Sequence, residues 1–292
     1  MMPWAAKAER GSTWLIHLIA WLARAVGRPL CRALLLPIVL YFVVTDSMLR
    51  RASREFLGAA TGRPVHWRDI FAHVHAFAAT LLDRVYMAAG EFQRFRIKIE
   101  GDELVREALR SGRGCLLLGS HLGSFDLLSL ANRAFKGHPV SIMMHVDPRS
   151  RVRNIAGIDD SASRVIELGR PDSFLRAYEL LERGEIVAAL ADRVDGSGAS
   201  LPAPFFGRPA AFPLGPHVLA ARARAPVIMC FGLYEGAADY RIEFTAFGPP
   251  APADSRGAML QPVVARYALL LEQAARRQPL NWFNFYPFWA EA

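Results

Sequence analysis

Residues 114–126 read GCLLLGSHLGSFD, and this stretch decides the fold class. Its first half is a short apolar run enclosed by glycines, a pattern typical of a strand buried on both faces of a sheet. Small residues follow, and residues 124–135 then have the pattern of a helix. A buried strand, a turn and a helix in this order indicate an α/β protein, in which ligands bind beyond the carboxyl ends of the strands.

The rest of the chain continues this alternation. Strands are predicted at 95–100, 139–145, 164–168 and 185–193, with a closing hairpin at 226–235 and 239–247. Helices are predicted at 63–90, 101–112, 171–184 and 259–278. The predicted fold class is therefore α/β, with a mixed, largely parallel central sheet flanked by helices. We expect residues 1–90 to form a helical, membrane-facing lobe, and residues 91–292 to form the α/β core with its C-terminal helix.

Composition limits the classes of partner. The chain has 292 residues, 52% of them hydrophobic, and 35 Lys and Arg against 27 Asp and Glu give a net charge of +8. Such a surplus suits anionic lipid headgroups or an acidic carrier protein. Nucleic acid is disfavoured, because the chain has no zinc-finger or RNA-recognition signature and its aromatic residues lie within apolar runs. The cysteines, Cys31, Cys115 and Cys230, lack the spacing of a zinc site or a disulfide framework.

Residues 14–44 are the most apolar part of the chain, but Pro29, Pro37 and three arginines interrupt them. Arg24, Arg28 and Arg32 recur at every fourth position, so on a helix they would form one basic stripe. This layout predicts an uncleaved helix in the headgroup plane, with its arginines toward the lipid phosphates. A cleaved signal peptide and a buried helical hairpin are the alternatives.

His121 and Asp126 are the candidate catalytic pair. Both follow the buried strand, and Gly119 and Gly123 permit the turn that would bring them together. Ser124 is a candidate helix N-cap, which would place Asp126 in the first turn of the next helix. Asp126 could then accept the Nδ1 proton of the histidine and leave its Nε2 atom as a base. The alternative is a structural turn with a hydrogen-bonded histidine.

Other catalytic signatures do not compete with this pair. The sequence contains no G-x-S-x-G, H-E-x-x-H, Walker or G-x-G-x-x-G motif. His66, His73 and His75 lie close in sequence, but the side chains of residues two apart on a helix, such as His73 and His75, point in different directions. No metal site is therefore predicted there, and no cofactor is expected.

The block SHLGSFD resembles the H-x4-D/E motif of the glycerolipid and lysophospholipid acyltransferase superfamily, in particular its bacterial lipid A biosynthesis branch. Four further blocks also resemble that branch: LLPIVLYFVVTDSMLRRASREFL near the start, and then GEIVAALADR, FFGRPAAFPLGPHVLAARARAPVIMCF and PLNWFNFYPFW. The likeness extends from about residue 12 to 290 and implies an O-acyltransferase. In such an enzyme, His121 would take the proton of an acceptor hydroxyl, with Asp126 as its partner, and the acyl chain would come from a thioester. The resemblance also implies substrate-binding residues, namely Ser124, Asp192, Arg193, Phe206, Gly207 and Arg208.

Departures from the family pattern leave the acceptor open. Ser124, Phe125 and Asp126 stand where the lipid A enzymes typically have Asn-Trp-Glu. The expected acceptor is a membrane lipid or a lipid A-like glycolipid, and the expected location is the cytoplasmic face of a bacterial inner membrane. The donor is either acyl carrier protein or acyl coenzyme A. We expect acyl carrier protein, with Arg149 and Arg151 as its docking residues, because carrier proteins are acidic.

Two other functions fit the same residues. A thioesterase or lipid hydrolase would use the histidine and its carboxylate to activate water instead of a lipid hydroxyl. A non-catalytic lipid-binding protein would use the basic N-terminal lobe as a membrane tether.

Overall fold

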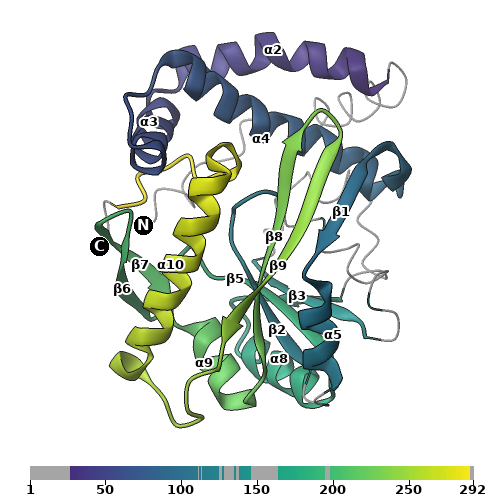
Figure 1. Ribbon diagram of the computed structural model, residues 1–292, viewed down its shortest axis with the longest axis vertical. Helices are drawn as coiled ribbons and strands as arrows, with labels where there is room; N and C mark the ends of the chain where they lie inside the picture. The colour runs from purple at the N-terminus through teal and green to yellow at the C-terminus, as the bar shows by residue number, and fades with distance from the viewer. Residues whose placement is uncertain are drawn as a thin grey trace.

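The computed structural model describes residues 27–110, 112, 114–124, 127, 135, 138–145, 164–194 and 198–289 (Figure 1). Their main element is a seven-stranded sheet with the order β1-β9-β8-β2-β5-β3-β4. Neighbouring strands are parallel, except that β8 and β9 form an antiparallel hairpin. The strands are β1 (Arg96–Glu100), β2 (Cys115–Gly119), β3 (Val140–Met144), β4 (Arg164–Glu167), β5 (Ile186–Leu190), β8 (Val227–Gly236) and β9 (Asp239–Gly248).

Helices cover both faces of this sheet (Figure 1). The helices α3, α8, α9 and α10 contribute to the apolar core on one face, and α4 and α5 to the core on the other. Their bounds are α3 (Ser47–Thr61), α4 (Trp67–Ala88), α5 (Asp102–Arg110), α8 (Ser173–Glu182), α9 (Gly215–Ala223) and α10 (Gln261–Arg277). Among the described residues, short 3₁₀ helices connect these elements: η1 (Phe92–Arg94), η3 (Gly257–Leu260) and η4 (Pro279–Asn281).

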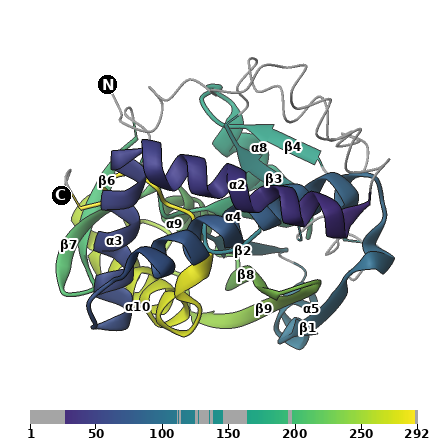
Figure 2. The ribbon, with the colours of Figure 1, turned by 90° about the horizontal axis from the view of Figure 1, so that it is seen from above.

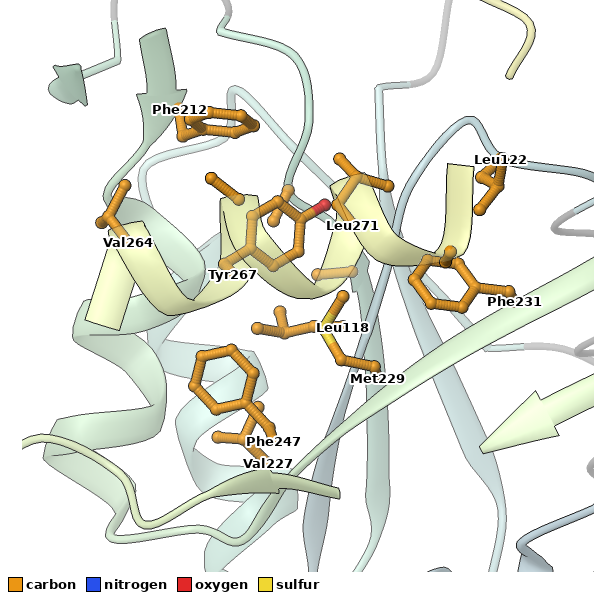
Figure 3. Packing of buried hydrophobic residues seen from close by; sticks show 14 of the residues in the cluster. Leu118, Leu122, Phe212, Val227, Met229, Phe231, Phe247, Val264, Tyr267 and Leu271 are labelled. Atoms are coloured by element: carbon orange, nitrogen blue, oxygen red, sulfur yellow. The ribbon is translucent and has the colours of Figure 1, made fainter. Parts of the chain in front are cut away.

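Strand β2 shows why the sheet needs both layers. Its side chains alternate between the two cores: Leu116 and Leu118 belong to one, Cys115 and Leu117 to the other. Figure 3 shows Tyr267 of α10 within the first core, among residues that include Leu118 and Met229. The apolar run of β2 is therefore continuous because no face of the strand meets water.

The predicted α/β class with a mixed, mostly parallel sheet is confirmed, and so is the closing hairpin. The sequence did not lead us to predict a second hairpin, formed by β6 (Ser200–Phe205) and β7 (Arg208–Pro213). Four prolines within these strands argue against a central strand, since proline cannot donate to a ladder. A separate two-stranded ribbon tolerates them because each strand has one unpaired edge.

The first described helix is α2 (Arg28–Thr45), which lies along α4 (Figure 2). The two prolines do not end this helix. Pro29 occupies the first turn, where its missing N–H costs no hydrogen bond, and α2 continues through Pro37. The helix is long and apolar enough to cross a membrane, judged by length and composition alone.

The predicted orientation of Arg28 and Arg32 toward lipid headgroups is wrong. Both side chains point into the protein, where the buried carboxylate of Asp83 accepts hydrogen bonds from them. Arg28 donates two bonds of 2.7 Å to Asp83, and the Tyr240 hydroxyl donates a third, of 2.8 Å. Both arginines also donate to the carbonyl of Ala237, in the turn between β8 and β9. This buried cluster fixes α2 to the sheet, and Arg24 lies outside the described residues.

Candidate functional site

The carboxyl ends of β2 and β5 bring two polar residues together. The strands are parallel neighbours, with Gly119 of β2 in register with Leu190 of β5. His121 and Asp192 each lie two positions beyond that pair, so the register itself places them side by side. The carbonyl of Gly119 is held by the backbone N–H of Ala191 at 3.1 Å and by the Tyr267 hydroxyl at 2.8 Å. The turn that carries His121 is therefore fixed to both β5 and α10.

The turn after β2 packs tightly against β8. Gly123 has a φ of +82°, and a Cβ atom there would lie 2.1 Å from the carbonyl oxygen of Gly232. In turn, a Cβ on Gly232 would lie 2.2 Å from the carbonyl oxygen of Ser124. Only glycine fits at either position, because the two backbones touch. Their contact explains why the sequence after the strand is rich in small residues.

A segment near the C-terminus closes over the same turn. The backbone N–H of Gly123 donates to the carbonyl of Asn281 at 2.7 Å, and that of Phe283 donates to the carbonyl of His121 at 2.8 Å. Leu122 and Trp282 form an isolated antiparallel bridge. The histidine turn is thus held like a short strand between β8 and residues 281–284.

The histidine and its carboxylate form a well-aligned pair. His121 Nδ1 lies 2.9 Å from Asp192 Oδ1, and the His121 backbone N–H donates to Asp192 Oδ2 at 3.0 Å. Asp192 is fully buried, whereas 28% of the His121 side chain is exposed. Among the described residues, no side chain or backbone group is hydrogen-bonded to His121 Nε2. The geometry fixes the Nδ1–H tautomer and directs the basic lone pair of Nε2 away from Asp192.

Two further residues complete the surroundings of Asp192. Asn284 Nδ2 donates to Asp192 Oδ2 at 3.1 Å, and Arg193 Nε donates to Asn284 Oδ1 at 2.7 Å. Arg193 also donates to the carbonyl of Phe283 at 3.1 Å, and its guanidinium lies over the Tyr286 ring, 5.5 Å from the centroid. Within the described residues, a chain of contacts therefore runs from His121 through Asp192 and Asn284 to Arg193.

Burial and charge set the protonation states of the pair. Burial lowers the pKa of His121, and the positive charge of Arg193 acts in the same direction, while Asp192 opposes both. Burial alone would raise the pKa of Asp192, but its interactions with His121 and Arg193 outweigh this effect and lower that pKa to about 2. Near neutral pH the pair is therefore a neutral imidazole beside a carboxylate, which is the state that a general base requires.

Several predicted site residues cannot be placed. Asp126, the predicted partner of His121, lies outside the described residues, as do Arg149 and Arg151. Ser124 is buried, and its backbone N–H donates to the Gly232 carbonyl at 2.7 Å. The carboxylate that the structure describes at Nδ1 is Asp192, which the resemblance had assigned to substrate binding.

Phe206, Gly207 and Arg208 lie at the turn between β6 and β7. Phe206 and Gly207 both have positive φ values, 52° and 73°, as the tight turn of a two-residue hairpin requires. A Cβ on Gly207 would meet no atom within 4 Å, so this glycine serves the turn and not a close approach within the protein. Arg208 pairs with Glu55 and lies over the Trp289 ring, 4.7 Å from the centroid. Neither His121 nor Asp192 takes part in these contacts, and substrate binding at this turn stays a prediction.

Asn284 is a site residue that the sequence reading missed. It lies within the block PLNWFNFYPFW, one of those that carry the family resemblance. An asparagine within a block of aromatic residues indicates a buried amide, and a buried amide needs hydrogen-bond partners. In the part of the chain that the structure describes, no group of three acidic, histidine or cysteine side chains could hold a metal ion.

The comparison with protein families agrees with this geometry. The profile of the family described as bacterial lipid A biosynthesis acyltransferase matches residues 7–291, nearly the whole chain. A search of curated proteins gives no match. The matched region contains both strands that carry the histidine and its carboxylate, and also the C-terminal segment that closes the site. The chain therefore belongs to the bacterial lipid A biosynthesis acyltransferase family.

Proposed function

We propose that this protein transfers a fatty acyl chain from acyl carrier protein to a hydroxyl of a lipid A-like membrane lipid, with His121 as the general base. Family membership supports an acyltransferase acting on lipid A-like lipids. The observation that carries the assignment of the base is the His121–Asp192 pair at the carboxyl ends of β2 and β5. A partly exposed histidine on a fully buried carboxylate suits proton transfer better than packing.

The proposed reaction needs no covalent acyl-enzyme. The Nε2 atom of His121 takes the proton of the acceptor hydroxyl while the hydroxyl oxygen attacks the thioester carbonyl carbon. The carbon–sulfur bond then breaks, and the imidazolium returns its proton to the leaving thiolate. Asp192 keeps the imidazole in the Nδ1–H tautomer and stabilises the imidazolium that forms between these steps. The products are an ester and a free thiol.

Arg193 is the cation closest in sequence to this pair, and we propose that it faces an anionic part of the substrates. Burial lowers the pKa of its guanidinium, but an arginine remains protonated at any physiological pH. Its Nε atom donates to Asn284 Oδ1, and its planar guanidinium lies over the Tyr286 ring. A guanidinium fixed in this way suits a lipid phosphate or the oxyanion of the tetrahedral intermediate.

Acyl carrier protein is the proposed donor because the net charge of +8 favours an acidic partner. The proposed docking residues, Arg149 and Arg151, come after β3, whose carboxyl end lies at the same edge of the sheet as His121. Carrier thioesters are cytoplasmic, so a carrier-dependent enzyme would work on the cytoplasmic face of the inner membrane. Coenzyme A is the other possible donor and acts as a co-substrate in the same way.

The test is an assay of the purified full chain with acyl carrier thioester, with and without lipid A precursor. We expect thioester consumption to depend on the acceptor, and mass spectrometry to find the precursor heavier by one acyl chain. Rapid thioester hydrolysis without acceptor would instead show a thioesterase, which shares the same base. No turnover of either kind, with carrier or coenzyme A thioesters, would support the non-catalytic lipid-binding alternative.

We further propose that α2 lies in the membrane interface with its outer face in lipid. The helix has the reverse of the usual polarity: its arginines point inward to Asp83, and large apolar side chains point outward. In a protein surrounded by water such an exposed apolar face would be costly. The exposed residues are Leu30, Leu34, Leu36, Ile38, Leu40, Tyr41, Phe42 and Val44.

The packing of α2 favours a helix in the membrane plane over a spanning one. Val39 and Val43 share a core with Ile70 and Val74, near the start of α4. At its other end, Arg28 binds Asp83 near the end of α4. The two helices therefore lie antiparallel along most of α2. A spanning α2 would bring the charged side chains of α4 to membrane depth, which is costly.

Replacing two outer residues with acids should release the protein from lipid. We expect Leu34→Glu with Tyr41→Glu to lower co-sedimentation with phosphatidylethanolamine–phosphatidylglycerol vesicles at least about tenfold, because two apolar contacts become charged. Both side chains are exposed, 46% and 62%, so the fold should tolerate the change. The matched control is Leu175→Glu with Leu269→Glu, on α8 and α10, whose side chains are exposed to a similar extent, 59% and 54%. Unchanged sedimentation of the α2 variant, or equal loss in the control, would contradict the assignment.

A further inference from the structure

Asn284 joins the two charged residues that follow β5. Its side chain is 1% exposed, and both ends of its amide are used: Nδ2 donates to Asp192 and Oδ1 accepts from Arg193. Asp192 and Arg193 are adjacent in sequence, yet no ion pair within 4.0 Å joins these two described residues. The amide lies between the anion and the cation. We propose that Asn284 is a positioning residue that keeps Arg193 from pairing with Asp192, so that the Oδ1 atom of the carboxylate is left to the imidazole of His121; this inference rests on the proposed role of His121 as base.

The hydrogen-bond chemistry supports this role. Asp192 can only accept hydrogen bonds and Arg193 can only donate them, so a residue that bridges them must do both. The amide of asparagine does so in one fixed orientation, because turning it over would oppose Nδ2 to Arg193 and Oδ1 to Asp192. An apolar side chain at position 284 could make neither of these hydrogen bonds. The amide orientation in turn keeps Asp192 Oδ2 engaged while Oδ1 faces the imidazole.

The same arrangement keeps the negative charge of Asp192 available to the imidazole of His121. A guanidinium bound directly to Asp192 would weaken the hold of the carboxylate on the imidazole and disfavour the imidazolium that forms during the reaction. With the amide between them, Asp192 remains available to His121, and Arg193 is held by Asn284, Phe283 and Tyr286 instead. Asn284 thereby separates a pair of charges that would otherwise neutralise each other.

The test compares Asn284→Asp and Asn284→Ala by kinetics and by NMR titration of the imidazole nitrogens of labelled His121. A second carboxylate beside Asp192 should favour the imidazolium, so in Asn284→Asp the titration of His121, and the acid limb of kcat/KM, should move to higher pH by about one unit. Asn284→Ala should lower kcat about tenfold with little change in KM, because the base is less well oriented while the acceptor still binds.

Asn281→Ala is the matched control. Asn281 is also buried in this segment, but its amide binds the backbone of Tyr234 and not Asp192. We expect it to lower stability without moving the titration of His121. The proposal fails if Asn284→Asp leaves that titration in place, or if Asn281→Ala moves it as far. If His121→Ala keeps full activity while Asn284→Asp still moves the titration, the role of His121 as base is wrong and the positioning of the pair stands.

Discussion

His121→Ala is expected to lower the rate of acyl transfer by about 10²- to 10⁴-fold, because it removes the positioned base. The fold should survive, since the turn around His121 is held by backbone hydrogen bonds from residues 281–284 and by the Gly123–Gly232 contact. The measurement is kcat/KM with acyl carrier thioester and lipid acceptor, together with the circular dichroism spectrum of the variant. A folded variant with near-normal activity would show that another group removes the proton.

The pH dependence of acyl transfer is a second test of His121 as the base. His121 acts as a base only when its imidazole is neutral, and burial lowers its pKa below the ordinary value of 6.5. Activity should therefore be full near pH 7 and fall as the pH drops through the lowered pKa. Protonation of Asp192 does not limit this range, because its pKa is about 2. An acid limb that persists in His121→Ala would belong to another group.

The carboxylate partner can be identified with two amide variants. Asp192→Asn should approach the loss caused by His121→Ala, because Asp192 accepts three hydrogen bonds. Its amide has one acceptor oxygen, so an NH₂ group must face at least one of these donors. Asp126→Asn should be milder, because the carboxylate that the structure describes at His121 Nδ1 is Asp192. The reverse ranking would assign the orienting role to Asp126, as the family motif alone implies.

The histidine and the sheet could be predicted from the sequence for one physical reason. Strands β2 and β5 are buried on both faces, so their apolar runs are continuous and their ends are marked by the first polar residues. His121 and Asp192 are among those residues, and parallel strands deliver their carboxyl ends to one edge. The sequence thus placed both residues at that edge.

What could not be predicted depends on register and on distant contacts. The pairing of His121 with Asp192 follows from the alignment of Gly119 with Leu190, which no local pattern reports. Asn284 meets Asp192 across 92 positions. The orientation of α2 was predicted wrongly because helical periodicity shows which arginines share a face but not which way that face points. The buried Asp83, far along the chain, decides it.

Asp83→Ala is expected to lower the free energy of unfolding by about 3–5 kcal/mol, the cost of removing one member of a buried ion pair. Asp83 has no exposed side-chain surface, and the paired Arg28 and Arg32 side chains are 14% and 17% exposed. Without the carboxylate, two cations would remain close together in a site with little water to solvate them. Urea unfolding of the full chain in detergent, followed by circular dichroism, measures this change.

Two further variants separate the lost charge from a generally sensitive fold. Glu179→Ala on α8 removes an exposed pair with Arg183 and should change stability by less than about 1 kcal/mol. Arg28→Met and Arg32→Met combined with Asp83→Leu should recover most of the loss, because apolar side chains of similar volume can replace a whole buried ion cluster at little cost. If Asp83→Ala unfolds no more easily than Glu179→Ala, the cluster does not hold α2 to the sheet. In our account, the bonds of Arg28 and Arg32 to Asp83 set the orientation of α2. That outcome would mean that something else turns the apolar face of the helix outward.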